Sequence, residues 1–144
     1  MARLPDPKAG YQSFAEPMPP RMRMISRSLA SAKLWPEWPI GMVLTWERGN
    51  RTWYQGISGK AIGGPPDAIL DLRHDVNAGP ILARLGAAGA APNLHCDPVA
   101  GEWTMEVALA GRMLLVTGET LAMAAASALA QFYGLLTPEE AEAE

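Results

Sequence analysis

The prolines of this chain gather near its beginning, and they restrict what that part can form. Seven of the thirteen prolines lie among the first forty residues. Each proline lacks a backbone donor and biases the preceding residue away from helix. We therefore expect an irregular segment over residues 1–20, a helix that ends before Pro36, and an extended corner around Trp35 and Trp38.

An apolar stripe at helical spacing runs between these prolines. Apolar side chains recur every three or four positions, at Met18, Met22, Ile25, Leu29 and Ala32. This period predicts an amphipathic helix over residues 21–35. Arginines and serines occupy the other side, so the helix can bury one face and expose a basic one.

A β-hairpin is predicted next along the chain. Two β-favouring segments, 40–47 and 51–57, flank Gly49 and Asn50, a pair that tolerates the positive φ of a tight turn. A run of glycines and prolines at 59–66 follows and indicates a boundary.

The pattern after this boundary is more regular. Asn77 is a candidate N-cap for a helix over residues 78–85, followed by Gly86 as its stop. Three strands follow, at about 93–96, 102–109 and 113–117, because apolar and polar residues alternate there.

The last predicted helix begins after Thr117 or Thr120 and ends at Gly134. Its apolar face is unbroken and rich in alanine, which permits close approach to a sheet or another helix. That face comprises Leu121, Ala124, Ala125, Ala128, Leu129 and Phe132.

We therefore expect an α+β fold in which an antiparallel three-stranded meander is flanked by helices. The predicted organisation is a basic, proline-rich arm with its helix (1–38), a single domain (39–136) and a frayed acidic tail (137–144). Within the domain, an α-βββ-α body over 66–134 follows the hairpin. We expect residues 66–136 to fold without the arm.

Four motifs in the second half carry a family resemblance. They are DLRHDVNA at 71–78, ILARLG at 81–86, GEW at 101–103 and GETLA at 118–122. With them, residues 71–134 resemble the small bacteriophage proteins grouped as the phage ABA sandwich domain family. The family has no established reaction, so the resemblance implies a phage or prophage origin and no catalytic residues.

The charge of the chain is divided unequally. Residues 1–60 carry nine Lys or Arg against four acids, a net of +5, and residues 61–144 carry three against eleven, a net of −8. This division suggests a basic arm on an acidic body and a partner for the arm. An acid-free stretch and the aromatics after it provide the predicted partner-binding residues, which are Arg21, Arg23, Arg27, Lys33, Trp35 and Trp38.

Few residues suggest chemistry. The one cysteine excludes an internal disulfide. Cys96 follows His95 in a predicted strand, where successive side chains point to opposite faces, so we expect a structural thiol. Asp67, Asp71 and Asp75 recur every four residues; they would suit magnesium, but caps and solubilising charge are the favoured interpretation. We expect no enzyme activity, no metal and no cofactor.

These observations favour a phage-encoded, non-enzymatic interaction module, acting as an accessory factor or host-directed inhibitor through its basic arm. The alternative is a virion component, such as a decoration, head or connector protein, in which the arm of one copy lies on the body of the next. A nucleic-acid-binding protein or metal-dependent nuclease is a further alternative. No apolar run reaches about 18 residues, so we expect no membrane-spanning helix, and we expect the protein in the host cytoplasm or in the virion.

Overall fold

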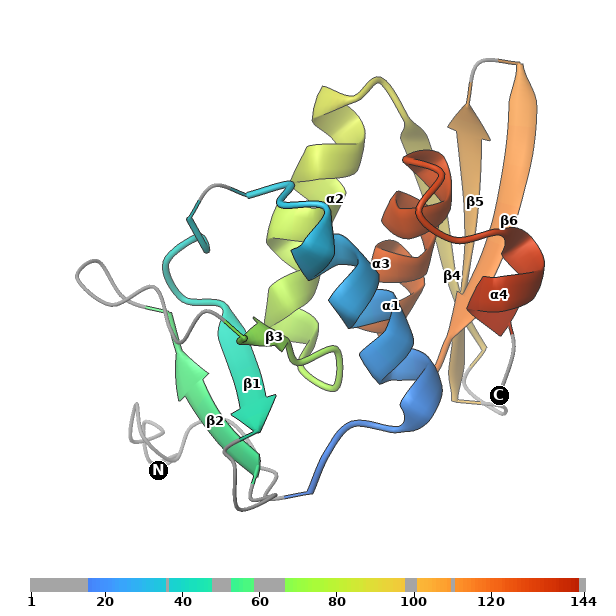
Figure 1. Ribbon diagram of the computed structural model, residues 1–144. Helices are drawn as coiled ribbons and strands as arrows, with labels where there is room; N and C mark the ends of the chain where they lie inside the picture. Colours follow the sequence, from blue (N-terminus) through green and yellow to red (C-terminus); the bar gives the residue numbers. More distant parts are fainter. Residues whose placement is uncertain are drawn as a thin grey trace, which may run out of the picture.

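The computed structural model describes residues 16–35, 37–47, 53–58, 67–97, 101–109 and 111–142. It contains two three-stranded antiparallel sheets, with three helices standing between them (Figure 1). The predicted α+β class is confirmed. No helix in this described part of the chain combines the length and apolarity that a bilayer span requires.

The first sheet contains the predicted hairpin. Strands β1 (Val43–Glu47) and β2 (Trp53–Ile57) pair antiparallel, and the short strand β3 (Ile69–Leu70) adds to the other edge of β1. The predicted turn at 49–50 and the predicted boundary at 59–66 lie outside the described residues.

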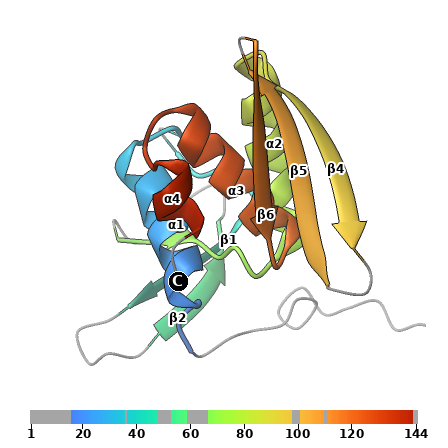
Figure 2. The same ribbon diagram turned by 90° about the vertical axis from the view of Figure 1, so that its right-hand side faces the viewer.

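The second sheet is the predicted meander, formed by β4 (Ala91–Asp97), β5 (Glu102–Leu109) and β6 (Arg112–Gly118). Met105 and Val107 of β5 are buried beneath the helices. The helices of the described residues lie on one side of this sheet rather than on both, as Figures 1 and 2 show.

Helix α3 (Leu121–Phe132) is the centre of the core. Thr120 caps it, since its side chain accepts from the Met123 N–H, and every residue from 122 to 130 is buried. The burial is wider than the predicted face, and Phe132 is only half-buried at its end. Small residues permit this packing: a Cβ on Gly118 of β6 would lie 2.6 Å from the backbone nitrogen of Ala124.

Helix α2 (Ala78–Ala87) follows a 3₁₀ turn, η1 (Asp75–Asn77). The helix begins where predicted, but the prediction that Asn77 caps it was wrong. The Asn77 side chain makes no capping bond and contacts the strand β1 instead. The chain leaves the helix at Gly89, whose φ of +88° favours glycine, rather than at Gly86.

Helix α1 (Pro20–Ser31) packs between α3 and the first sheet. Its predicted apolar face is buried against α3 and β3, with Met22, Ile25 and Leu29 at most 2% exposed. The Ser26 hydroxyl also donates to the Leu70 carbonyl over 2.6 Å. The helix predicted to belong to an appended arm therefore forms part of the same core as the rest of the chain, because its apolar stripe has no other cover.

The predicted frayed tail is a short helix, α4 (Pro138–Glu142). Thr137 and Glu140 form a reciprocal capping box: the Thr137 N–H donates to the Glu140 carboxylate, and the Glu140 N–H donates to the Thr137 hydroxyl. Ala141 is fully buried against the body. Capping and burial together explain why this acidic segment is ordered.

Shortening the buried face of α1 is expected to destabilise the whole domain. Ile25→Ala and Leu29→Ala should each lower the free energy of unfolding by about 2–5 kcal/mol, because each leaves a cavity beside α3. Urea unfolding followed by circular dichroism measures this change. The control is Ser31→Ala, at an exposed position of the same helix, which should change it by less than about 0.5 kcal/mol. Equal small effects for all three would show that α1 is not part of the core.

Candidate functional site

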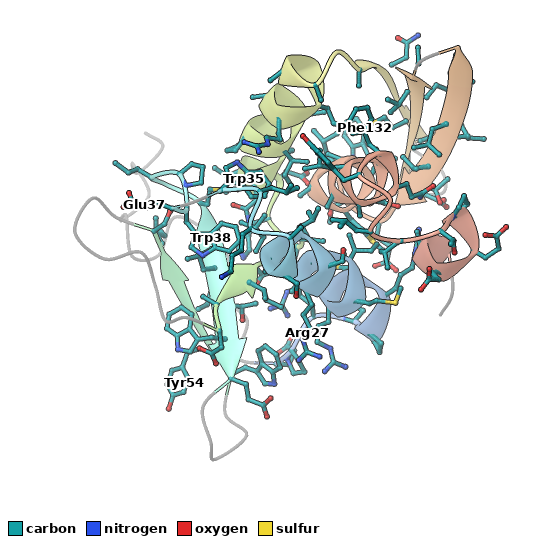
Figure 3. All side chains as sticks on the ribbon, turned by 45° about the horizontal axis from the view of Figure 1, so that its top comes forward. Arg27, Trp35, Glu37, Trp38, Tyr54 and Phe132 are labelled. Atoms are coloured by element: carbon teal, nitrogen blue, oxygen red, sulfur yellow. The ribbon has the colours of Figure 1, made fainter. Side chains whose placement is uncertain are left out.

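The outward face of α1 carries the first candidate site in the described residues. Pro20, Arg23, Met24 and Arg27 lie on one side of the helix, opposite its buried stripe, and line an open hollow of about 340 Å³. Arg27 is exposed and projects from the side of the helix away from α3 (Figure 3). We call these four residues the α1 face.

The two arginines of the α1 face are suited to bind an anionic group. They are one helical turn apart, so both guanidinium groups can reach the same ligand. Neither forms an ion pair with another described residue, and the buried Nε of Arg23 has no hydrogen-bond partner among them. The hollow thus presents two guanidinium groups with no opposing carboxylate among the described residues.

Arg21, also a predicted contact residue, points elsewhere. Its Nε donates to the carbonyl of Ala141 in α4, and its Nη2 donates to the carbonyl of Thr117 in β6 over 3.0 Å. Arg21 therefore connects α1 to the last helix and the second sheet.

The remaining predicted contact residues lie beyond the C-terminal end of α1. Lys33 is exposed, and its φ of +50° turns the chain out of the helix. The rings of Trp35 and Trp38 lie 5.8 Å apart and are half-buried against the core. Figure 3 shows both tryptophans well away from Arg27. The structure thus groups Arg23 with Arg27 and separates the others from them.

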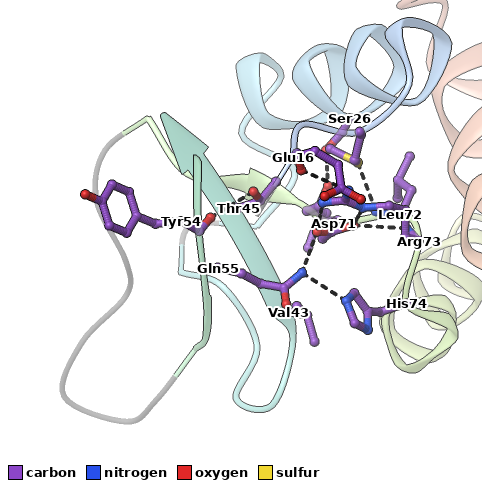
Figure 4. Close-up of polar contacts among 12 residues, drawn as sticks. Glu16, Ser26, Val43, Thr45, Tyr54, Gln55, Asp71, Leu72, Arg73 and His74 are labelled. Carbon is purple, nitrogen blue, oxygen red and sulfur yellow. Dashed lines mark hydrogen bonds and ion pairs between the residues drawn. The ribbon is translucent and has the colours of Figure 1, made fainter. Parts of the chain in front are cut away.

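A second polar cluster surrounds the fully buried Asp71 (Figure 4). The Arg73 guanidinium donates to both carboxylate oxygens, at 2.9 and 2.7 Å, and also to the backbone carbonyl of Glu16. The Gln55 amide of β2 donates to the same carboxylate over 2.6 Å. Asp71 therefore connects the hairpin to the segment before α1.

His74 completes this cluster. The Nε2 atom of His74 lies 2.9 Å from the Nε2 atom of Gln55. This Gln55 nitrogen also donates to the Asp71 carboxylate, so it is a donor, and the imidazole nitrogen that accepts from it belongs to a neutral His74. Burial lowers the pKa of His74 below 6.5; Arg73 lowers it further, while Asp71 and Asp75 oppose the change.

Asn77 provides another buried connection. Its side-chain amide accepts from the N–H of Val43 and donates to the carbonyls of Val43 and Asp71, each over 2.8 Å. The amide thus pairs with β1 much as a neighbouring strand would. Caps and solvated charge were the roles predicted for this part of the chain. The contacts of Gln55 and Asn77 were not predicted, because no local pattern gives a signal for them.

Asp71 and Asp75, two of the residues considered for chemistry, have separate structural partners. Asp71 contacts Arg73 and Gln55, and the Asp75 carboxylate accepts from the N–H of Ala122 at the start of α3. Among the described residues there is no group of three or more His, Cys, Asp or Glu side chains that could hold a metal ion. Cys96 and His95 are successive residues of β4, and their side chains lie outside the described part.

Comparisons with known proteins leave the family undetermined. No protein-family model matches the chain, so the phage resemblance stays a prediction. No curated protein matches it. No solved structure matches it either.

Neutralising Asp71 is expected to be costly. Asp71→Asn should lower the free energy of unfolding by about 3–5 kcal/mol, because the Arg73 guanidinium, only 10% exposed, would lose its counter-charge. The control Asp67→Asn makes the same chemical change at an exposed position. Its free energy of unfolding, measured by denaturant titration, should be within about 0.5 kcal/mol of the wild-type value. Similar values for the two variants would contradict a structural role for the Asp71 cluster.

Stability should also decrease as the pH falls below 6.5. The pKa of His74 is lower in the folded protein than the 6.5 of the unfolded chain, so the unfolded chain binds more protons between the two values. The contribution of the neutral His74 to the free energy of unfolding is therefore fully present above pH 6.5. It is lost as the pH falls toward the pKa of His74 in the folded protein. Urea midpoints measured on both sides of 6.5 test this expectation. His74→Gln keeps an acceptor but does not titrate, so it should flatten the profile; an unchanged slope would exclude His74 as its origin.

Proposed function

We propose that this protein is a non-enzymatic interaction module that binds an acidic protein surface through the α1 face. The observation that supports the proposal is the hollow in which Arg23 and Arg27 flank the apolar Met24. Paired guanidinium groups favour carboxylates, and the apolar side chain favours a partner that also presents apolar groups.

This arrangement favours a protein partner over a nucleic acid. A nucleic-acid site combines many phosphate contacts, commonly about 6–10, with aromatic side chains on which bases stack. The α1 face has two arginines and no aromatic ring, and the half-buried Trp35 and Trp38 lie away from it. A role as an accessory factor or host-directed inhibitor fits such a module, and the phage origin remains a prediction of the resemblance alone.

An enzyme is the less supported alternative. The carboxylate of Asp71, the most buried acid described, already accepts from Arg73 and Gln55. A general base needs access to a substrate proton, and this group is fully covered. The cluster accordingly supports a structural role.

Binding of model ligands tests the proposal. A fluorescent peptide alternating Glu and Leu should bind the wild type more tightly than poly-glutamate or a single-stranded oligonucleotide of equal charge. Arg27→Glu should weaken peptide binding about tenfold or more, since it replaces attraction by repulsion.

The matched control is Lys33→Glu, which makes the same change of charge at an exposed residue that does not line the hollow. It should alter peptide affinity by less than about threefold. Tighter binding of the oligonucleotide would favour a nucleic-acid partner instead. Peptide binding that is absent, or equally reduced by both substitutions, would contradict the assignment to the α1 face.

A further inference from the structure

The second sheet has one face that no described helix or strand covers. Helices α2 and α3 pack on its other side, and the outer face is open in Figure 2. On β6, Met113 and Leu115 are 66% and 60% exposed on this outer face. They are the two most exposed large apolar side chains of the sheet in the described residues.

Acidic residues lie beside these apolar ones. Met105 and Val107 of β5 are buried, so alternation places Glu106 and Ala108 on the outer face. The register pairs Glu106 with Leu115 and Ala108 with Met113. Glu102, four residues before Glu106, belongs to the same face. The open face thus combines two carboxylates with two exposed apolar side chains.

The open face and the α1 face are complementary in kind. One presents two carboxylates with Met113 and Leu115, and the other presents two guanidinium groups with Met24 and Pro20. Opposite charges steer two such surfaces together and fix their orientation, while the apolar side chains provide buried area. The acidic amphipathic surface that the α1 face requires is therefore present on the chain itself.

We propose that the α1 face of one copy docks on the open face of the β4-β5-β6 sheet of a second copy. This inference rests on the proposed function and names its partner. The two faces belong to different elements, so the contact is heterologous, and a bound pair retains one unused α1 face and one unused open face, on different copies. Copies can therefore add head to tail into a ring or an open chain.

Light scattering coupled to size-exclusion chromatography at low salt tests this docking of one copy on another. The average mass of the wild type should rise with protein concentration and fall when salt is added, because the contact is partly electrostatic. Arg23→Glu with Arg27→Glu should stay monomeric. Met113→Thr with Leu115→Thr, which keeps β-favouring residues at exposed positions, should assemble far less than the wild type.

A mixture of the two double variants gives the decisive result. The first retains an intact open face and the second an intact α1 face, so together they should form a two-chain species that neither forms alone. The two remaining faces, one with added glutamates and one without its apolar groups, cannot pair, so the complex should not grow. The control Val76→Thr alters an exposed apolar residue outside both faces and should assemble like the wild type.

Two outcomes would overturn the inference: a wild type that is monomeric at every concentration, or a mixture that stays monomeric. Since circular dichroism and peptide binding can be measured on the same samples, loss of fold is separable from loss of docking. A monomeric wild type that still binds the Glu/Leu peptide would retain the proposed function and reject the second copy as its partner. A wild type that neither binds the peptide nor assembles would reject both.

Discussion

Burial of the apolar stripe of α1 is the contact on which the rest of the architecture depends. The helix packs against β3 on one side and α3 on the other, so it occupies the space between the two sheets. Met22, Ile25 and Leu29 are removed from water there, and each contributes on the order of 1.5–3 kcal/mol by that burial. The same burial fixes the rotation of the helix, which turns Arg23 and Arg27 outward.

Polar groups fasten the hairpin to this core. The Asn77 side chain replaces the hydrogen bonds to β1 that a longer third strand would make, since β3 has only two residues. The Asp71 carboxylate holds Gln55 of β2. Such buried polar connections are specific, because every member must find its partner, and they are costly when one partner is missing. The surface of the hairpin can thus vary more freely than the residues beneath it.

The sequence predicted local structure better than it predicted partners. Spacing alone identified the buried side of α1 and the strands of the meander, because periodicity reports which side of an element is covered. It could not show that Arg21 and Arg23, two residues apart and chemically alike, face different ways: one reaches Thr117 and Ala141, and the other lines the hollow. The Asp71 cluster likewise needs Gln55 from a distant strand. The Thr137–Glu140 box was readable from its spacing, and it shows that acidic composition alone does not imply fraying.

The position of α1 in the chain also affects how the protein is made. Its contacts are with residues far along the sequence: Ser26 bonds to a residue 44 positions later, and Arg21 to one 120 positions later. A nascent chain therefore displays the apolar side of α1 long before α3 and α4 leave the ribosome. Contacts of this range slow folding, and the exposed stripe is a site where a chaperone or a neighbouring nascent chain can bind first. Among the described residues, α1 therefore precedes its last partner, Ala141, by 120 positions during synthesis.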